Sequence, residues 1–280
     1  MEATVDLNTY YITINPAGLA GAPARRYQEQ VHEHLRWIHR TISGAILLNC
    51  IRRPNFPIEI RPHPLAECNA TGGGEAKSIG TGYRGFVTYT PGYFGHSGVC
   101  AASDGADTSG RIFDEILFHE LVHVFRNATG MWNQSPLLGW GMLQYDDNEE
   151  FIAVLCTNIY LSDRSNKIKS GLRDGHRGYG AMSAADAGRF RMFINSASAL
   201  PLIKQFCADN PIFTKVLSDK LPNIDYNPIA DYLRFPALCE ACSIFGKYND
   251  RKKFDDFLRA NGVMAAVIEQ LTNPLRVPGK

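Results

Sequence analysis

The segment 109–128 constrains the fold most, because its apolar residues fall on almost every side of the helix that they predict. These apolar residues are Ile112, Phe113, Ile116, Leu117, Leu121, Val124 and Phe125. Asp107, Thr108 and Ser109 are suitable N-terminal caps, and Gly130 is a suitable stop. A helix that is apolar nearly all round belongs at the centre of a globular domain, where its polar side chains must find partners.

Within this helix, residues 119–123 read His-Glu-Leu-Val-His. His119 and His123 are four residues apart, so both imidazoles project from one face of the helix, one turn apart. This spacing lets them bind one Zn²⁺, and Glu120 can hold a metal-bound water and take its proton. Zinc lowers the pKa of such a water from about 15.7 to about 7, which provides a nucleophile at neutral pH. The alternative is a pair of core histidines that are satisfied by hydrogen bonds.

A catalytic zinc site needs a third protein ligand, and two glutamates are available at the start of a second predicted helix, 148–161. We favour Glu150, because Ala153 lies three residues later and a small residue there lets two helices approach closely. Glu149 remains the alternative. Whichever of the two does not bind metal is expected to be an ordinary acidic residue of the first helical turn.

A His-Glu-x-x-His helix followed by a helix that carries a glutamate resembles the zincins, specifically the zinc metallopeptidases with a glutamate as third ligand. Residues 116–123 and 149–162 further resemble the metallopeptidase effectors that bacteria deliver into other cells, and the likeness spans about residues 80–180. The resemblance implies a zincin-like fold, Zn²⁺ as cofactor and hydrolysis of peptide bonds in a protein or peptide substrate. It also implies that the edge strand of a short sheet lines the cleft and pairs with an extended substrate chain, and residues 86–90 are the candidate for that edge.

Zincins usually place a His, Tyr or Arg opposite the metal, where it stabilises the oxyanion. His176 is one candidate, because it is the only histidine after the motif and lies in a polar segment that can return over the cleft. Tyr145, Tyr160 and Tyr179 are alternatives, and His176 can equally be an exposed loop residue.

The rest of the chain predicts one α+β domain, with a small mixed or antiparallel sheet on the central helix and no regular alternation of strands and helices. Its predicted parts are an extended arm (1–24), a catalytic core (25–182) and a mostly helical C-terminal part (183–280). Apolar residues at helical spacing predict a helix over 25–43 that ends at Gly44. The predicted strands are 45–51, 57–61 and 86–90, and the predicted loops are the glycine-rich segments 69–85 and 91–108.

The remaining histidines and the cysteines predict no second site. His32, His34 and His39 lie mostly off the apolar stripe of the 25–43 helix, so we expect them on its solvated face. The seven cysteines are scattered and odd in number, which favours reduced, buried thiols over a disulfide framework. Cys239 and Cys242 form a CxxC pair inside a predicted helix, and we interpret it as structural.

Composition excludes several classes of protein. Twenty-nine basic against 28 acidic residues give a net charge of +1, so a nucleic acid is not an expected partner. A hydrophobic content of 45% excludes a disordered chain. The sequence shows no Sec signal and no membrane span, which predicts a soluble protein that is cytoplasmic or is delivered by a specialised secretion system into a target cell.

The sequence therefore predicts a hydrolase, a zinc metallopeptidase that acts through a zinc-bound water, with an effector or toxin role implied by the resemblance. His119, His123 and Glu150 are the expected metal ligands, and Glu120 and His176 are the expected catalytic residues. The alternatives are a non-catalytic binding protein on a zincin fold and a zinc hydrolase of a non-peptide amide.

Overall fold

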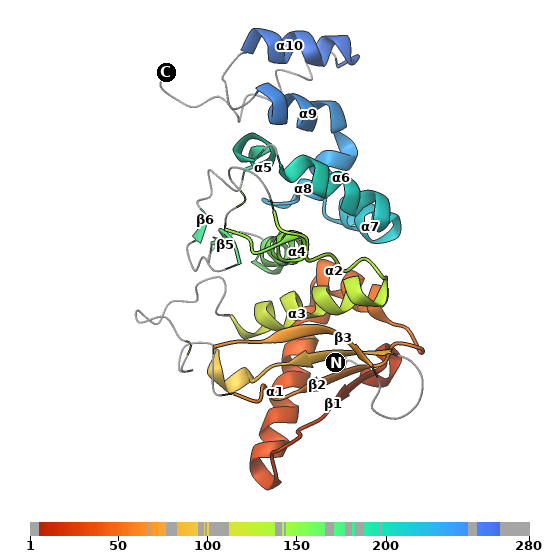
Figure 1. The fold of residues 1–280 in the computed structure, drawn as a ribbon, viewed down its shortest axis with the longest axis vertical. Helices are drawn as coiled ribbons and strands as arrows, with labels where there is room; N and C mark the ends of the chain where they lie inside the picture. The colour runs from red at the N-terminus through yellow and green to blue at the C-terminus, as the bar shows by residue number, and fades with distance from the viewer. Residues whose placement is uncertain are drawn as a thin grey trace.

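The protein is described by a computed structural model. The described residues are 6–65, 68–76, 83–94, 98, 100, 112–137, 142, 144–165, 171–176, 181–182, 188–196, 198–245 and 251–263. They form a mixed α+β structure in which the sheet lies at one end and a series of helices extends away from it (Figure 1).

Six strands belong to two sheets. A four-stranded sheet has the order β1-β2-β4-β3, and a small two-stranded sheet pairs β5 with β6. In the larger sheet β1, β2 and β4 are parallel, whereas β3 is antiparallel and lies at the edge. The strands are β1 (Ile12–Ile14), β2 (Ile58–Arg61), β3 (Thr71–Ala76), β4 (Tyr83–Thr88), β5 (Leu172–Arg173) and β6 (Ala181–Met182).

The helices fall into three groups along the chain. Two precede the larger sheet's central strands, two long helices carry the residues discussed below, and the rest follow residue 188. They are α1 (Gly21–Arg40), α2 (Ile42–Ile51), α3 (Phe113–Ala128), α4 (Asn148–Ser165), α5 (Arg191–Asn195), α6 (Ala199–Asp209), α7 (Pro211–Lys220), α8 (Pro228–Arg234), α9 (Pro236–Phe245) and α10 (Arg251–Ala260), with 3-10 turns η1 (Leu7–Tyr10) and η2 (Pro91–Tyr93).

Helix α3 is the centre of the molecule, as its apolar surface predicts. It packs against β3 and β4 on one side and against α4 on the other (Figure 1). Every residue from Asp114 to Arg126 is buried. The three polar side chains of its motif therefore lie between the sheet and α4. The predicted caps at 107–109 lie outside the described residues.

The predicted strand over 45–51 is wrong, because these residues belong to helix α2. A short apolar run fits a buried strand or a buried helix equally well, and the cap decides between them here. The Thr41 hydroxyl accepts a hydrogen bond from the Gly44 amide at 3.0 Å, which starts α2 directly after α1 ends at Arg40. Gly44 therefore begins a helix instead of ending one. A Cβ there would lie 1.9 Å from the Ile38 carbonyl oxygen, so the tight junction requires glycine.

The glycine-rich segment 69–85 was expected to be a loop, yet it contributes strand β3 and the first residues of β4. Gly72, Gly73 and Gly74 pair with β4 in regular antiparallel register. The strand that includes Phe86 is consequently interior, and the predicted edge at 86–90 is wrong. At Gly72 the close approach of α3 requires a glycine, because a Cβ there would lie 2.2 Å from the Glu120 carbonyl oxygen.

Two expectations about single residues are also wrong. His34 is buried on α1, because it lies three residues after Val31 and four before Ile38, so it belongs to the same helical face. Cys68 and Cys100 form a disulfide, which joins segments that are 32 residues apart. The other five cysteines are free, and Cys239 and Cys242 are buried in α9 as expected.

Several other predictions are confirmed. Strand 57–61 is β2, helix 148–161 is α4, and the described residues after 188 are mostly helical. The predicted extended arm over 1–24 is wrong in part, because η1 lies within it and α1 already begins at Gly21; β1 is its extended segment. No helix in the described part of the chain is long and apolar enough to cross a membrane.

Candidate metal centre

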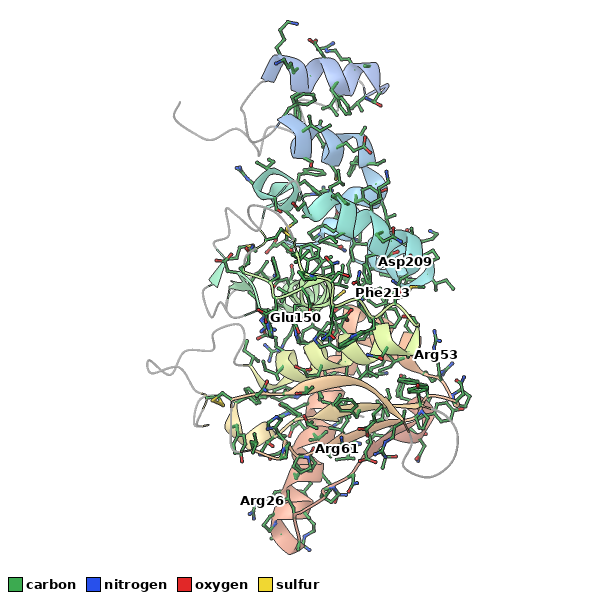
Figure 2. All side chains as sticks on the ribbon, viewed as in Figure 1. Arg26, Arg53, Arg61, Glu150, Asp209 and Phe213 are labelled. Carbon is green, nitrogen blue, oxygen red and sulfur yellow. A yellow bond between two sulfur atoms is a disulfide. The ribbon has the colours of Figure 1, made fainter. Side chains whose placement is uncertain are left out.

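The side chains of the motif on α3 meet a glutamate of α4 at the middle of the molecule. Glu150 lies between the sheet-bearing part and the C-terminal helices (Figure 2). Its carboxylate is 3.2 Å from Nε2 of His119 through Oε2, and 3.4 Å from Nε2 of His123 through Oε1. The structure therefore brings together the three residues that the sequence predicts as metal ligands.

The second ring nitrogen of each motif histidine has its own partner. Nδ1 of His119 lies 3.2 Å from the Thr157 hydroxyl, which donates its proton to the Ala153 carbonyl, and 3.0 Å from Nη1 of Arg173, which can only donate. Nδ1 of His123 lies 3.2 Å from Oε1 of Glu149. Such outer partners fix the tautomer and orientation of histidines that bind metals.

Glu149 and Glu150 thus lie on different sides of His123. Glu149 is buried behind His123 and also accepts a hydrogen bond from Arg126 Nε at 2.6 Å. Glu150 faces the Nε2 atoms of both imidazoles. The geometry favours Glu150 as the ligand and gives Glu149 the role of orienting His123.

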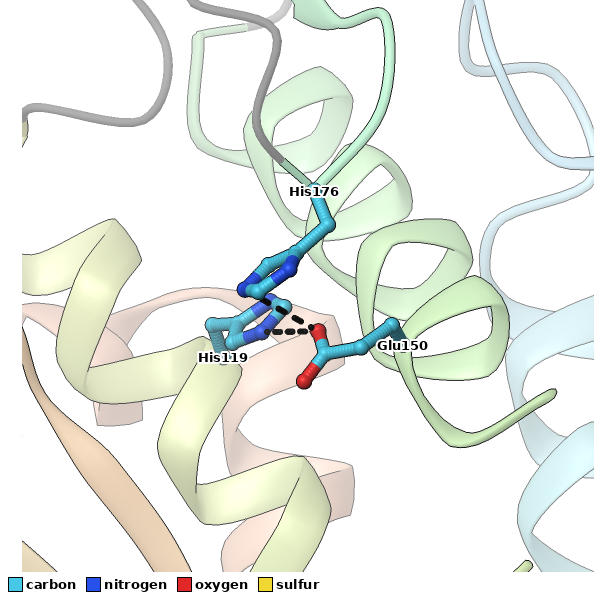
Figure 3. Close-up of side chains that lie close together, drawn as sticks. All are labelled: His119, Glu150 and His176. Carbon is cyan, nitrogen blue, oxygen red and sulfur yellow. Dashed lines mark hydrogen bonds and ion pairs between the residues drawn. The ribbon is translucent and has the colours of Figure 1, made fainter. Parts of the chain in front are cut away.

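His176 joins this group from the segment that follows β5. Its Nε2 is 3.5 Å from Oε2 of Glu150, and its Nδ1 is 2.6 Å from Oδ2 of Asp146. Its ring is nearly parallel to that of His119, with centroids 6.1 Å apart. Ligand atoms of His119, Glu150 and His176 all lie within 4.8 Å of one another (Figure 3).

The tyrosines proposed as alternatives to His176 are placed elsewhere or are not described. Tyr160 donates a hydrogen bond to Asp114 and stacks on Phe118 inside the core. Tyr145 is buried with its ring edge-on to Phe151. Neither lines the cleft described below. Tyr179 lies outside the described residues.

Sequence reasoning missed Arg173, a buried arginine beside the motif. Its Nη1 lies 3.0 Å from Nδ1 of His119, and its Nη2 donates to the His176 carbonyl at 3.2 Å. The Asn158 side-chain amide holds the Arg173 backbone by two hydrogen bonds, of 2.8 and 2.9 Å. The contact with His119 joins residues that are 54 apart in the chain, so no local spacing signals it.

Burial and neighbouring charges separate the protonation behaviour of the acids and bases. Burial, aided by the Arg173 charge, lowers the pKa of His119 to about 3. Burial also acts on His123, but its hydrogen bonds to Glu149 and Glu150 outweigh this effect and raise its pKa to about 10. Burial raises the pKa of Glu120 to about 7, which suits a general base near neutral pH. The Glu150 pKa is lowered, because hydrogen bonds from both imidazoles outweigh its burial.

The centre opens into a cleft of about 450 Å³. Strand β3 forms one wall, at the glycines that lie against α3. Glu120, His123, Glu150 and His176 all reach this cleft, and its other side chains are neutral or aromatic. They include Asn69, Thr71, Phe86, Asn127, Trp132 and Gln134.

The donors that converge here suit zinc, which takes imidazole nitrogen and carboxylate oxygen. Two of the imidazoles and Glu120 are nearly inaccessible to solvent, yet Glu120 faces an open cleft. The arrangement can hold a cation, activate a water beside it and admit an extended chain along β3. Comparison with protein-family models, curated proteins and solved structures finds nothing that matches this chain.

Proposed function

We propose that this protein is a zinc-dependent metallopeptidase that hydrolyses peptide bonds of a protein or peptide substrate. The observation that carries the proposal is the convergence of His119 Nε2 and His123 Nε2 on the Glu150 carboxylate, beside a cleft that also exposes Glu120. The two histidines and Glu150 would hold the metal. When bound, zinc supplies Lewis acidity, which makes water more acidic and polarises a carbonyl group.

The chain's own residues supply the proton transfers. Glu120 reaches the cleft, and its pKa of about 7 lets it take a proton from water and pass it to the leaving amine. The Glu120 backbone lies directly against Gly72, which holds this residue beside β3. His176, whose Nδ1 pairs with Asp146, lines the same cleft and is the candidate for stabilising the oxyanion that develops on the substrate.

The zincin-like character of the fold is part of the same proposal. Three features support it: the antiparallel edge strand β3, its place beside the motif helix, and the glutamate on the following helix. In this arrangement a substrate would lie extended along β3, so β3 replaces residues 86–90 as the strand that pairs with it.

The test combines metal content with peptide cleavage, using the full chain. We expect about one zinc per chain and cleavage of peptides in a mixed peptide library. Glu120→Gln should keep the zinc and lose activity by about 10²–10⁴-fold, because it removes the proton acceptor and leaves the ligands intact. Glu29→Gln, on the exposed surface of α1, is the matched control and should cleave at the wild-type rate.

Each of the other outcomes has a definite meaning. Wild-type cleavage by Glu120→Gln would show that another group is the base. A protein without stoichiometric zinc would point to a non-catalytic binding protein. A zinc-loaded protein that cleaves no peptide in the library would point to hydrolysis of a different amide.

A further inference from the structure

Three imidazoles, not two, present Nε2 to the Glu150 carboxylate. His119 and His176 both approach the same oxygen, Oε2, at 3.2 and 3.5 Å, while His123 approaches Oε1 at 3.4 Å. The motif alone accounts for two of these contacts. The third brings in a residue from a different element, and it needs a separate explanation.

The size of these distances is informative. Donors bound to one tetrahedral zinc at about 2.0–2.1 Å lie about 3.3 Å from one another. The spacing from Glu150 Oε2 to the nitrogens of His119 and His176 matches this value on both sides.

The surroundings of His176 are also those of a metal ligand. Its Nδ1 is paired with the Asp146 carboxylate, as Nδ1 of His123 is paired with Glu149. A carboxylate behind a histidine fixes the ring and raises the basicity of the nitrogen that faces the metal. The backbone of His176 is held as well, by its amide to the Gln144 carbonyl and by Arg173.

We propose that His176 is a fourth protein ligand of the resting metal centre, which extends the metal site of the proposed function. Its side chain is 33% exposed, against 4% for His119 and 5% for His123, so it is the one of the three with room to turn. A site with four protein ligands is closed, whereas a catalytic zinc site keeps one position open. His176 must therefore turn away from Glu150 before a substrate can be hydrolysed, and a role at the oxyanion then requires that its Nε2 carries a proton.

The test counts ligands and measures zinc affinity, independently of activity. X-ray absorption of the zinc-loaded wild type should show three imidazoles, and His176→Ala should show two. A chelator competition should show that His176→Ala weakens zinc binding by at least about tenfold, and that Asp146→Asn, which keeps the imidazole, weakens it by a similar or smaller factor. His32→Ala, on α1, is the matched control and should change neither reading.

Two imidazoles in the wild type, with unchanged zinc affinity in His176→Ala, would overturn the inference and leave the proposed function intact. A wild type that binds no zinc would overturn both. Circular dichroism and thermal unfolding of each variant separate a lost ligand from a lost fold. If His176→Ala does not fold, the imidazole count in the wild type and the affinity of Asp146→Asn decide the question.

Discussion

His34 and the histidines of the metal centre are all buried, yet their surroundings differ completely. His34 is 6% exposed and lies in an aromatic pocket on α1. Its Nδ1 is 3.1 Å from the Tyr89 hydroxyl, and its ring stacks on Phe113 with centroids 4.4 Å apart. The Tyr89 hydroxyl donates to the Phe113 carbonyl, so it can accept from the His34 ring. The groups that contact the Nδ1 and the ring face of this histidine are neutral.

The centre surrounds its histidines with carboxylates. His123 lies between Glu149 and Glu150, and His176 lies between Asp146 and Glu150. Burial lowers the pKa of His34 to about 4, whereas the carboxylates raise that of His123 to about 10. Burial alone therefore does not distinguish a core histidine from a ligand. Convergence of several Nε2 atoms on one carboxylate is the observation that favours a metal site here.

The strongest test of this difference removes one histidine from the candidate metal centre and one from the aromatic pocket around His34. His123→Ala deletes a ligand, so we expect loss of stoichiometric zinc and of all measurable cleavage. His34→Phe keeps the stacking area on Phe113 and removes only one hydrogen bond, so zinc content should stay at the wild-type level. Elemental analysis of both purified proteins checks this. Zinc retained by His123→Ala would show that the motif is a pair of core histidines.

The second prediction uses pH. Burial lowers the pKa of His34 from its ordinary value of 6.5 to about 4 in the folded protein, so the unfolded chain binds a proton more readily. Its contribution to the free energy of unfolding is complete above pH 6.5, falls as the pH drops toward about 4, and then levels off, with a total of up to about 3 kcal/mol. Denaturant unfolding at several pH values should show a steeper acid loss for the wild type than for His34→Phe. Parallel curves would contradict the neutral pocket.

The smallest expected effect, on zinc affinity, comes from substituting Glu149, which pairs with Nδ1 of His123. Glu149→Gln keeps the size of the side chain but weakens the partner of His123 Nδ1, so zinc affinity should fall by about 10–100-fold. Glu29→Gln is again the control, because that side chain is exposed. Chelator competition measures both. A larger loss, with fewer oxygen ligands in X-ray absorption, would show that Glu149 binds the metal directly.

The sequence predicts the centre better than it predicts the sheet. Helix α3 follows from local spacing, and Glu150 on the next helix does lie 3.2 Å from His119. Its role as metal ligand, in place of Glu149, stays a prediction. Strand β3 could not be predicted, because its three successive glycines carry no side chains and so show no alternation. Helix α3 can be predicted because its own side chains show the helical pattern, whereas β3 has too few side chains to show a strand pattern.

Non-local contacts explain the other wrong expectations. The partner of Cys68 lies 32 residues away, and neither cysteine has a sequence context that signals the other. His34 looks polar and therefore exposed until Tyr89, which directly follows β4, supplies its hydrogen bond. Asp146, 30 residues before His176, becomes its neighbour only through the fold.

The glycines of β3 also bear on selectivity. Gly72, Gly73 and Gly74 line the cleft without a single Cβ among them, so this wall presents main-chain groups only. An extended chain along this wall would contact it through its peptide groups, so the contact would not depend on the side chains of that chain. Discrimination between one substrate sequence and another then falls to the remaining lining residues, above all the aromatic rings of Phe86 and Trp132.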